Sequence, residues 1–461
     1  MRGCLAIFFG RALLVALRVL RSGGSVLPGV LAEFISPGIL IRLIGNSEII
    51  FVTGSNGKTS TTRMAVSILR AHGHEVFTNS SGANMKYGII ASLLAVPKRT
   101  RKGIALLEVD EGHIETLADL LKPSTALFLN LQVDQLNRFH DPGTVLVKLK
   151  NSLAFVKDVL IFNLNEPCFS ELLESSLASQ KLSVYGFSSS SDILNSIPTT
   201  GLLPHLGGQF SPPGRIESLC HIEYYSARTA HFSIQGVDRL QEIQLRTEGV
   251  HHAQNAAAAF ALCMKILGDE FDPNKASSAV SLSTPAFGRD QVISLAGQPV
   301  RILLMKNPRS MQVNLESIAA GSRVMIGIDG GTPDPSWLYD VNLSAIKRAV
   351  VTGSMAWQVA LALSYAGVVI DLVEPNLFRA TNYFLRHSSS DKFQSFYNKK
   401  SEVLRKSNFD NNQCVTATHL DADFNRDQFG AKDDSAMVMI LNYEMSMRLL
   451  RHYRYLDSSC Y

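Results

Sequence analysis

A short glycine-rich stretch, residues 53–60, constrains the fold of this chain more than any other part of it. Its sequence is Thr-Gly-Ser-Asn-Gly-Lys-Thr-Ser, and it lies between an apolar run at residues 49–52 and a helical pattern at residues 64–69. A strand, a glycine turn and a helix in this order point successive backbone N–H groups at one place, where Lys58 adds a positive charge. The stretch therefore predicts a phosphate-binding loop. Its expected contact residues are Gly54, Ser55, Asn56, Gly57, Lys58, Thr59 and Ser60.

The loop differs from the common phosphate-binding pattern at one position. That pattern has a glycine five residues before Gly57, where this chain has Val52. The alternative interpretation is an ordinary strand-to-helix turn that carries a lysine. The strand before the loop and the helix after it favour phosphate binding.

Composition limits the class of protein. At 461 residues the chain is too long for a single core, so two or three domains are expected. Apolar residues make up 46% and charged residues 18%, as in an ordinary soluble globular protein, and the net charge of +4 gives no support for nucleic-acid binding. The six cysteines include no C-x-x-C pair, which disfavours a disulfide framework and favours a cytoplasmic protein.

Residues 1–44 are expected to form an N-terminal helical segment. Residues 5–20 are apolar enough to resemble a signal or a membrane anchor, but Arg11 and Arg18 interrupt them. The two arginines are seven residues apart and therefore share one helical face. We favour an amphipathic helix that packs on the protein or makes peripheral contact with the inner face of the cell membrane; the alternative is a targeting segment.

Alternating strands and helices over residues 48–185 predict a doubly wound, mainly parallel α/β sheet. Expected strands lie at residues 49–52, 75–78, 103–109, 125–130 and 159–163. The domain that contains them is expected to span residues 45–288. Serine, glycine and proline are frequent at residues 188–218, and short alternating strands follow at 221–225 and 231–234, so we expect an insertion near residues 188–240.

A smaller α/β domain is expected at residues 289–461. Its expected strands lie at residues 300–305, 323–328 and 349–352, and a helix is expected at residues 355–366. The stretch near residues 388–435 is rich in serine, asparagine and charged residues, which predicts a polar insertion.

Glu108 is the candidate metal ligand. It lies near the end of the apolar strand expected at residues 103–109, and a carboxylate at the C-terminal end of a parallel strand lies where open α/β sheets bind ligands. Mg²⁺ is usually held by one or two carboxylates together with phosphate oxygens. The alternative for Glu108 is a solvated acidic turn. The polar residues 130–138, after another expected strand, are expected at the same edge of the sheet.

Several motifs together resemble the Mur ligase superfamily. They are the loop at residues 54–59 in its glycine-x-x-glycine-lysine-threonine form, residues 108–111, Asn163 with Glu166 and Pro167, Asn255, and residues 287–289. Within that superfamily, further stretches resemble the MurT family, the ligase subunits of lipid II isoglutaminyl synthase. These stretches are residues 24–29, 78–85, 134–138, 306–308, 336–340, 365–367 and 442–443.

The resemblance implies a ligase with a Mur ligase-type ATP domain and a smaller C-terminal domain, which works with a glutamine amidotransferase of the GatD type. ATP and Mg²⁺ are the implied cofactors. ATP would phosphorylate the α-carboxylate of D-isoglutamate in the lipid II stem peptide. Ammonia from the partner would then displace phosphate and leave D-isoglutamine. A carboxylate is a poor electrophile, so the phosphoryl group supplies the leaving group that amidation needs.

The resemblance also implies roles for single residues. Lys58 would bind the β- and γ-phosphates, and Thr59 and Glu108 would hold Mg²⁺. Asn255 would contact the adenine, and Arg289 would belong to the ATP site.

Two further positions concern the substrate and the partner. Gln135 stands where amino-acid-adding Mur ligases often have a metal-binding histidine, a change that MurT proteins share. Asp340, or less favourably Asp334, matches an aspartate that completes the catalytic triad of the amidotransferase, because a Cys/His pair gains from a third group that orients the histidine. The alternative for Asp340 is a surface carboxylate that caps a turn.

The chain departs from the family in one marked way. MurT proteins usually carry a four-cysteine zinc ribbon in the ATP domain, whereas residues 216–240 keep only Cys220 and offer His221 and His231. These are too few and too badly spaced for a closed tetrahedral site, so no structural zinc is expected and the insertion is interpreted as degenerate.

Two other functions compete with the amidating ligase. One is a Mur-type ligase that adds an amino acid, against which residues 336–340 argue because they resemble a site for an ammonia-supplying partner. The other is a non-catalytic scaffold that binds nucleotide and the amidotransferase. Retention of Lys58, Thr59 and Glu108 argues against the scaffold.

Overall fold

The computed structural model describes most of the chain. The described residues are 2–19, 26–79, 83–97, 103–132, 142–178, 181–195, 216–283, 291–330, 334–387 and 437–453. The chain divides into two compact units. The first comprises Met1–Arg289, Lys306–Ser317 and Arg454–Tyr461, and the second comprises Asp290–Met305 and Ile318–Tyr453.

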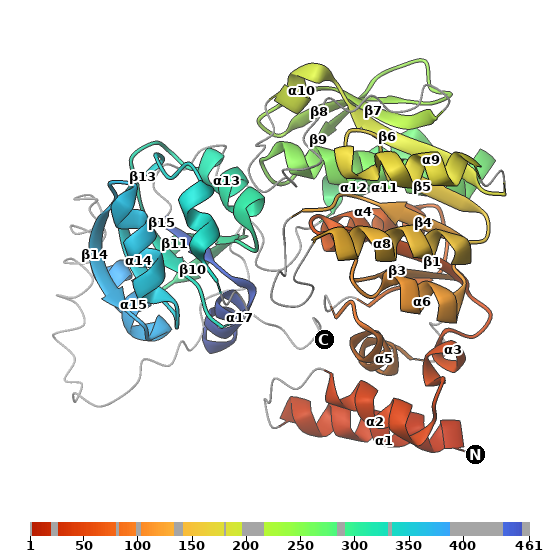
Figure 1. Cartoon of the computed structure of the whole chain (residues 1–461), viewed down its shortest axis with the longest axis horizontal. Coiled ribbons are helices and arrows are strands. Elements are labelled where there is room, and N and C mark those ends of the chain that lie inside the picture. The colour runs from red at the N-terminus through yellow and green to blue at the C-terminus, as the bar shows by residue number, and fades with distance from the viewer. Residues whose placement is uncertain are drawn as a thin grey trace. The chain divides into compact units, whose positions relative to one another are not determined.

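The first unit is built on one large sheet, shown in Figure 1 with its helices on both sides. In spatial order its strands are β2 (Val76–Phe77), β3 (Ile104–Glu108), β1 (Glu48–Thr53), β4 (Thr125–Phe128), β5 (Val159–Asn163), β6 (Ser183–Ser189), β7 (Glu217–Ser226), β8 (Thr229–Ile234) and β9 (Gln241–Gln244). Strands β2 to β7 pair in parallel, and β8 and β9 extend the sheet with antiparallel pairs. The predicted mainly parallel α/β fold is thus confirmed.

Helices cover both faces of this sheet. Alternate residues of one strand enter different cores, as β1 shows, where Ile50 and Val52 face one core and Phe51 faces the other. The first core also takes residues of α4 (Lys58–Ala71), α11 (Val250–Leu267) and α12 (Pro273–Leu282). The second takes residues of α5 (Lys86–Ala95), α6 (Ile114–Leu121), α8 (Pro142–Ser152) and α9 (Ser170–Ala178). Shorter helical pieces are η2 (Leu153–Phe155), η3 (Pro167–Phe169), α10 (Ser191–Asn195) and η5 (Gly268–Glu270). The sheet is therefore buried on both sides, as the apolar strand sequences require.

Three helices precede β1. They are α1 (Arg2–Val19), α2 (Leu27–Ile35) and α3 (Ile39–Ile44), and they pack on one another and on α5 (Figure 1). Among the described residues, no helix is both long and apolar enough to cross a membrane. Arg11 of α1 is half-buried and donates to the carbonyl oxygens of Leu94 (3.0 Å) and Val96 (3.1 Å), so this part of the helix packs on the protein. The side chain of Arg18 lies outside what the structure describes.

The second unit contains a smaller sheet. Its strands, in spatial order, are β10 (Gln291–Leu295), β11 (Gln298–Leu304), β15 (Met437–Leu441), β12 (Ser322–Gly327), β13 (Ile346–Thr352) and β14 (Val369–Glu374). All neighbours are parallel except the β10–β11 hairpin. The helical elements of this unit are η6 (Ser336–Asp340), α14 (Ala356–Tyr365), α15 (Leu377–Arg386) and α17 (Tyr443–His452). The polar stretch expected near residues 388–435 lies outside the described residues.

Candidate functional site

The loop that follows β1 has the backbone that a phosphate-binding turn needs. Gly54 and Gly57 have φ angles of +138° and +86°, values at which a side chain would be strained. A Cβ on Gly54 would also lie 2.9 Å from the carbonyl oxygen of Asn130. Gly57 is the N-cap of α4, so the free N–H groups of the first helical turn begin where the loop ends.

The chain just after β4 holds the loop in place. Ser55 N donates to the Asn130 carbonyl oxygen (2.9 Å), and the side chain of Asn130 accepts from Asn56 N (2.9 Å) and donates to Asn56 O (3.0 Å). Gln132 N donates to Ser55 Oγ (3.0 Å). Sequence reasoning placed residues 130–138 at this edge of the sheet but did not identify Asn130 as the residue that fixes the loop.

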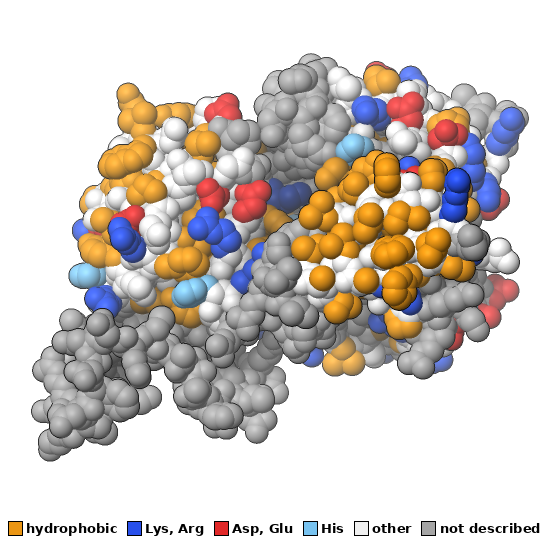
Figure 2. Space-filling model, turned by 90° about the horizontal axis from the view of Figure 1, so that it is seen from below, with side chains coloured by type: hydrophobic (Ala, Val, Ile, Leu, Met, Phe, Trp, Pro, Cys, Tyr) orange, Lys and Arg blue, Asp and Glu red, His pale blue; other side chains and the backbone are white. Residues whose placement is uncertain are grey.

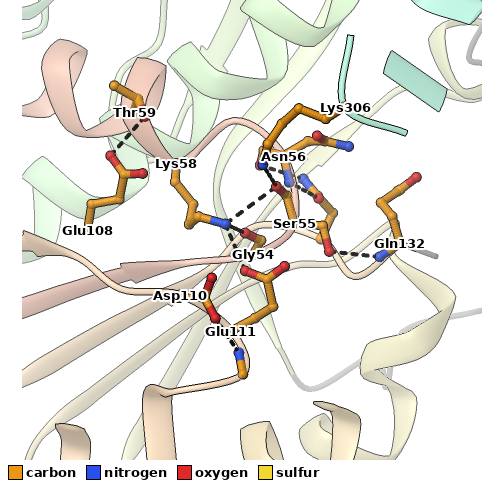
Figure 3. A network of polar contacts seen from close by, with 12 residues as sticks. Gly54, Ser55, Asn56, Lys58, Thr59, Glu108, Asp110, Glu111, Gln132 and Lys306 are labelled. Atoms are coloured by element: carbon orange, nitrogen blue, oxygen red, sulfur yellow. Dashed lines mark hydrogen bonds and ion pairs between the residues drawn. The ribbon is translucent and has the colours of Figure 1, made fainter. Parts of the chain in front are cut away.

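Lys58 is buried inside the loop. Figure 3 shows its ammonium turned toward Glu111, with Nζ 2.7 Å from Oε2, and it also donates to the carbonyl oxygens of Gly54 and Ser55. Lys58 and Glu111 are each 4% exposed. Sequence reasoning noted the acidic run at residues 108–111 but gave no role to Glu111, because a salt bridge across 53 positions leaves no local pattern.

Three carboxylates act on Lys58. Burial alone lowers the pKa of a lysine, but the nearby carboxylates of Glu111, Asp110 and Glu108 outweigh burial and raise the pKa of Lys58. The lysine is therefore charged at neutral pH, and it holds that charge at the point where the loop's N–H groups meet.

The side chains of Thr59 and Glu108 form a second hydrogen-bonded pair beside the Lys58–Glu111 pair. Thr59 Oγ1 donates to Glu108 Oε2 (2.8 Å) from the first turn of α4 to the end of β3. The buried side chain of Asn79 holds that end of β3, because it accepts from Glu108 N (2.9 Å) and donates to Glu108 O (2.8 Å). Sequence reasoning used residues 78–85 as a family mark, and the pairing of Asn79 with the backbone of Glu108 was not foreseen.

The residues present fit Mg²⁺ and a polyphosphate. A threonine hydroxyl and a carboxylate lie together beside a charged lysine, and Mg²⁺ needs only one or two such protein ligands because it keeps waters and phosphate oxygens. No group of three or more His, Cys, Asp or Glu suited to a metal occurs among the described residues, which this mode of binding does not require. Buried Thr53 Oγ1 and Gln132 Oε1 also lack a hydrogen-bond partner within the described part of the chain.

Asn255 lies on α11, against the start of α4. Its Oδ1 accepts from Thr61 Oγ1 (3.3 Å), and a Cβ added to Gly57 would collide with it. The expected adenine residue is thus within the same cluster as the phosphate loop. Its contact with adenine stays a prediction.

The segment Lys306–Ser317 groups with the first unit and contributes one more cation. Lys306 Nζ lies 3.5 Å from the carbonyl oxygen of Ser55, as Figure 3 shows. The side-chain amides of Asn307 and Asn56 are also within 3.5 Å of each other. Sequence reasoning used residues 306–308 only as a family mark, and no local pattern links them to the loop.

The two aspartates expected to serve a partner lie in the second unit. Asp334 accepts from Ser336 N (2.9 Å) and so caps its own turn, whereas Asp340 lies exposed at the end of η6. Among the described residues, the Asp340 carboxylate has no hydrogen-bond or ion-pair partner. Neighbouring Leu338 is fully buried and anchors η6.

Other expected site residues are placed differently. Arg289 and Gln135 lie outside the described residues.

The residues considered for zinc are placed as follows. Cys220 is buried in the first core, and burial raises the pKa of its thiol. The next residue, His221, forms a hydrogen bond through Nδ1 with Ser188 Oγ (2.7 Å). The predicted lack of a zinc site stays a prediction.

Comparison with known proteins supports the ligase interpretation. The Mur ligase middle domain family matches residues 52–263. The chain is 25% identical over 409 residues to the lipid II isoglutaminyl synthase (glutamine-hydrolyzing) subunit MurT of Staphylococcus aureus (strain COL), covering 83% of this chain and 92% of that protein. It is 27% identical over 359 residues to the protein of the same description from Streptococcus pneumoniae, covering 70% and 77%.

Solved structures agree with the fold. MurF from Acinetobacter baumannii superposes with a TM-score of 0.61 at 16% identity, covering 92% of this chain and 79% of that one. The MurF ligase from Thermotoga maritima, solved in complex with ADP, has a TM-score of 0.53 at 15% identity, covering 90% and 82%.

Proposed function

The chain belongs to the Mur ligase superfamily, and from this premise we propose that it is the ligase subunit that amidates the α-carboxylate of D-isoglutamate in the lipid II stem peptide. ATP supplies the activating phosphoryl group. Ammonia comes from a glutamine amidotransferase of the GatD type. The names of the relatives, subunits of a glutamine-hydrolyzing lipid II isoglutaminyl synthase, support the substrate and the partner.

One observation carries the chemical part of this proposal. A single cluster brings together the phosphate loop, the buried Lys58–Glu111 pair (2.7 Å) and the Thr59–Glu108 pair (2.8 Å). The first pair holds a positive charge beside the loop's N–H groups. The second offers two oxygen ligands at the N-terminus of α4. This is the arrangement that phosphoryl transfer needs, because catalysis of that reaction is mainly positioning and neutralisation of charge.

The residues have separate tasks in the proposed reaction. The N–H groups of residues 57–59, at the end of the loop and the start of α4, would bind phosphate oxygens, and Lys58 would exchange its contact with Glu111 for the phosphates. Thr59 and Glu108 would hold Mg²⁺, which shields the phosphate charges. Asn130 and Gln132 keep the loop in the geometry that binding needs.

The bond changes balance without a further reactant. A carboxylate oxygen of the stem peptide attacks the γ-phosphorus of ATP, and the bond from that phosphorus to the β-bridging oxygen breaks, which leaves ADP and an acyl phosphate. Ammonia then attacks the carbonyl carbon, loses a proton, and inorganic phosphate leaves. The products are the primary amide, ADP and phosphate.

The surface around Asp340 supports a partner subunit. Trp357, Leu361 and Tyr365 are spaced four residues apart on α14 and are exposed by 66%, 53% and 77%. Tyr339 of η6 lies edge-on to Tyr365 (ring centroids 6.0 Å apart). Exposed aromatic residues beside a carboxylate without a partner are typical of a protein interface. We propose that the amidotransferase binds here and uses Asp340 to orient its histidine.

The test is turnover by the chain together with its amidotransferase. With lipid II, glutamine and ATP, release of ADP should depend on all three substrates. A Lys58→Ala variant should lose about 100- to 1,000-fold in rate, as expected when a group that stabilises transition-state charge is removed.

Lys150→Ala is the matched control, because Lys150 lies on α8 with its side chain 47% exposed and should leave the rate unchanged. Turnover that ignores the loss of Lys58 would contradict the enzyme proposal. ADP release that requires an added amino acid instead of glutamine would indicate an amino-acid ligase.

A further inference from the structure

The first helix is packed in an unusual orientation. In α1 the small residues Gly3, Ala6 and Gly10 are buried, whereas Phe8 is 65% exposed and Phe9 is also exposed. The surface helices of soluble proteins show the opposite pattern, with apolar residues toward the core and polar residues toward water.

The second helix repeats this arrangement. In α2 the buried residues are Pro28, Gly29 and Ala32, and Phe34 is 84% exposed. Together the two helices present one apolar surface, which we call the α1–α2 face. Its main residues are Phe8, Phe9, Val15, Leu27, Val30 and Phe34. Figure 2 shows hydrophobic side chains gathered over a broad area in the view from below, where these helices lie.

Close packing fixes the orientation of both helices. A Cβ on Gly10 would lie 2.7 Å from Leu94 Cδ1, and a Cβ on Gly29 would collide with the carbonyl oxygen of Tyr87. The side of each helix that touches α5 therefore has no room for larger side chains. The helices cannot turn to bury their phenylalanines, so the α1–α2 face stays exposed in the isolated chain.

The charge around this face is positive. Residues 1–32 contain four arginines and no aspartate or glutamate. Arg2 is exposed on α1, and Arg42 is exposed on α3, where its guanidinium lies 3.5 Å from Cys4 Sγ. The first acidic residue, Glu33, is paired with Lys86 at 2.7 Å. A negatively charged surface would complement this region.

We propose that the α1–α2 face docks on the surface of a bilayer that contains anionic phospholipid. Large apolar side chains would enter the boundary between headgroups and acyl chains, and exposed arginines such as Arg2 would contact the lipid phosphates, whereas Arg11 is held by carbonyl oxygens of Leu94 and Val96. A second copy of the chain fits less well, because a two-fold interface would bring the same arginines toward each other. As an 18-residue helix, α1 is about 27 Å long and would lie along the membrane surface.

This proposal goes beyond the ligase chemistry and does not depend on it. A ligase that acts on a lipid-linked peptide would gain from such a surface, because docking confines enzyme and substrate to the same plane. The phosphate loop and Lys58 could bind nucleotide equally well in a chain that does not dock on a membrane. A negative result in the vesicle experiment would therefore not contradict the ligase proposal, and loss of the ligase proposal would not contradict membrane docking.

The test is co-sedimentation of the full chain with vesicles, either phosphatidylcholine alone or an equal mixture with phosphatidylglycerol. The chain should bind the mixed vesicles at least tenfold more tightly than a Phe8→Ser/Phe34→Ser double variant. Because both side chains are exposed, this variant should keep its melting temperature. Arg2→Gln should cause a smaller, several-fold loss that is seen only with the anionic vesicles.

The matched control is a Trp357→Ser/Tyr365→Ser double variant, which removes two equally exposed aromatic residues from the other unit. Its vesicle binding should equal that of the wild type. Equal binding by the Phe8/Phe34 variant, or no binding of the wild type to either vesicle, would overturn the proposal. So would a wild-type dimer in sedimentation velocity that the Phe8/Phe34 variant abolishes, since the face would then be an interface between copies.

Discussion

The phosphate site of the first unit and the Asp340 surface of the second differ in how their charged groups are held. Around Lys58 every carboxylate is buried: Glu108 is 4%, Asp110 2% and Glu111 4% exposed. Around η6 the acidic side chains are exposed, and Trp357 and Tyr365 project beside them. Buried charges must be paired, whereas exposed ones are free to meet a second molecule.

In the proposed reaction, the two regions differ in how much of each site the chain supplies by itself. The cluster around Lys58 has its lysine, its hydroxyl and its carboxylates already in contact, so the proposed binding of nucleotide would need only exchange of the Lys58–Glu111 contact. Asp340, in the proposed function, would be one group of a site whose other groups come from the amidotransferase.

The largest effect is expected from Asp340→Asn. Replacing a triad aspartate by asparagine leaves the shape but removes the charge that orients the histidine, so glutamine hydrolysis by the partner should fall about 1,000- to 10,000-fold. ATP binding by the chain should not change. Glutaminase rates of the complex and nucleotide affinity, measured separately, check this prediction.

Asp334→Asn is the control for Asp340, because Asp334 accepts from Ser336 N and caps its own turn. It should cost the partner little activity. If Asp334→Asn abolishes glutamine hydrolysis and Asp340→Asn does not, the two assignments must be exchanged. If both variants stay fully active, the surface has no such role.

A smaller effect is expected from Glu108→Gln. Loss of one of the proposed protein ligands should raise the Mg²⁺ concentration for half-maximal ADP release by about ten- to a hundredfold. A Mg²⁺ titration of turnover measures this. Glu174→Gln, on the exposed side of α9, should leave the titration unchanged. An identical Mg²⁺ curve for Glu108→Gln would remove Glu108 from the metal site.

The smallest effect concerns stability and sharpens the contrast within the second unit. Asp371 of β14 is paired with Arg323 (2.6 Å) and with Arg348, and its side chain is 4% exposed. Burial alone raises the pKa of this carboxyl, but its interactions with the two arginines outweigh burial and lower the pKa. Asp371→Asn should therefore destabilise the protein by about 2 kcal/mol at pH 7 without affecting catalysis.

The pH dependence follows from the sign of that shift. Because the pKa of Asp371 is lower in the folded state, its stabilisation is present above the ordinary carboxylate pKa and is lost as pH falls through the folded value. The difference between wild type and Asp371→Asn should thus shrink in acid, as measured by urea unfolding. The exposed Lys122–Asp119 pair (2.7 Å) is the control, and Asp119→Asn should cost less than about 0.5 kcal/mol. A difference that does not change with pH would exclude the ion pairs as its cause.

Much of the fold could be predicted because its signals are local. The expected strand at residues 49–52 appears as β1 (Glu48–Thr53), and the helix expected at 355–366 appears as α14 (Ala356–Tyr365). The β10–β11 hairpin was missed. Its two-residue turn places Ala296 at a φ of +50° and Gly297 at +79°; the glycine suits such a turn, but alanine rarely adopts this conformation, so the pair differs from the usual hairpin signals.

The cluster of side chains around Lys58 was also partly predictable. Lys58 and Thr59 lie in a local motif, and Glu108 ends an apolar strand, so their positions could be inferred from neighbours in the sequence. Asn79 and Asn130 could not be assigned roles, because what they do depends on strands that meet only in the folded sheet. The periodicity of the sequence likewise could not predict which face of α1 is buried. That depends on how closely α1 packs against α5, where only small side chains fit.

The most direct test of the account is an isotope-transfer measurement on the complex of this chain with its amidotransferase. The α-carboxylate of D-isoglutamate in lipid II would be labelled with ¹⁸O, and the phosphate released during amidation would be analysed by mass spectrometry. Activation through an acyl phosphate predicts one ¹⁸O atom in each phosphate, because the carboxylate oxygen bound to phosphorus leaves with it. Amidation that releases phosphate without ¹⁸O would contradict the central claim that the Lys58 site activates the carboxylate by phosphorylation.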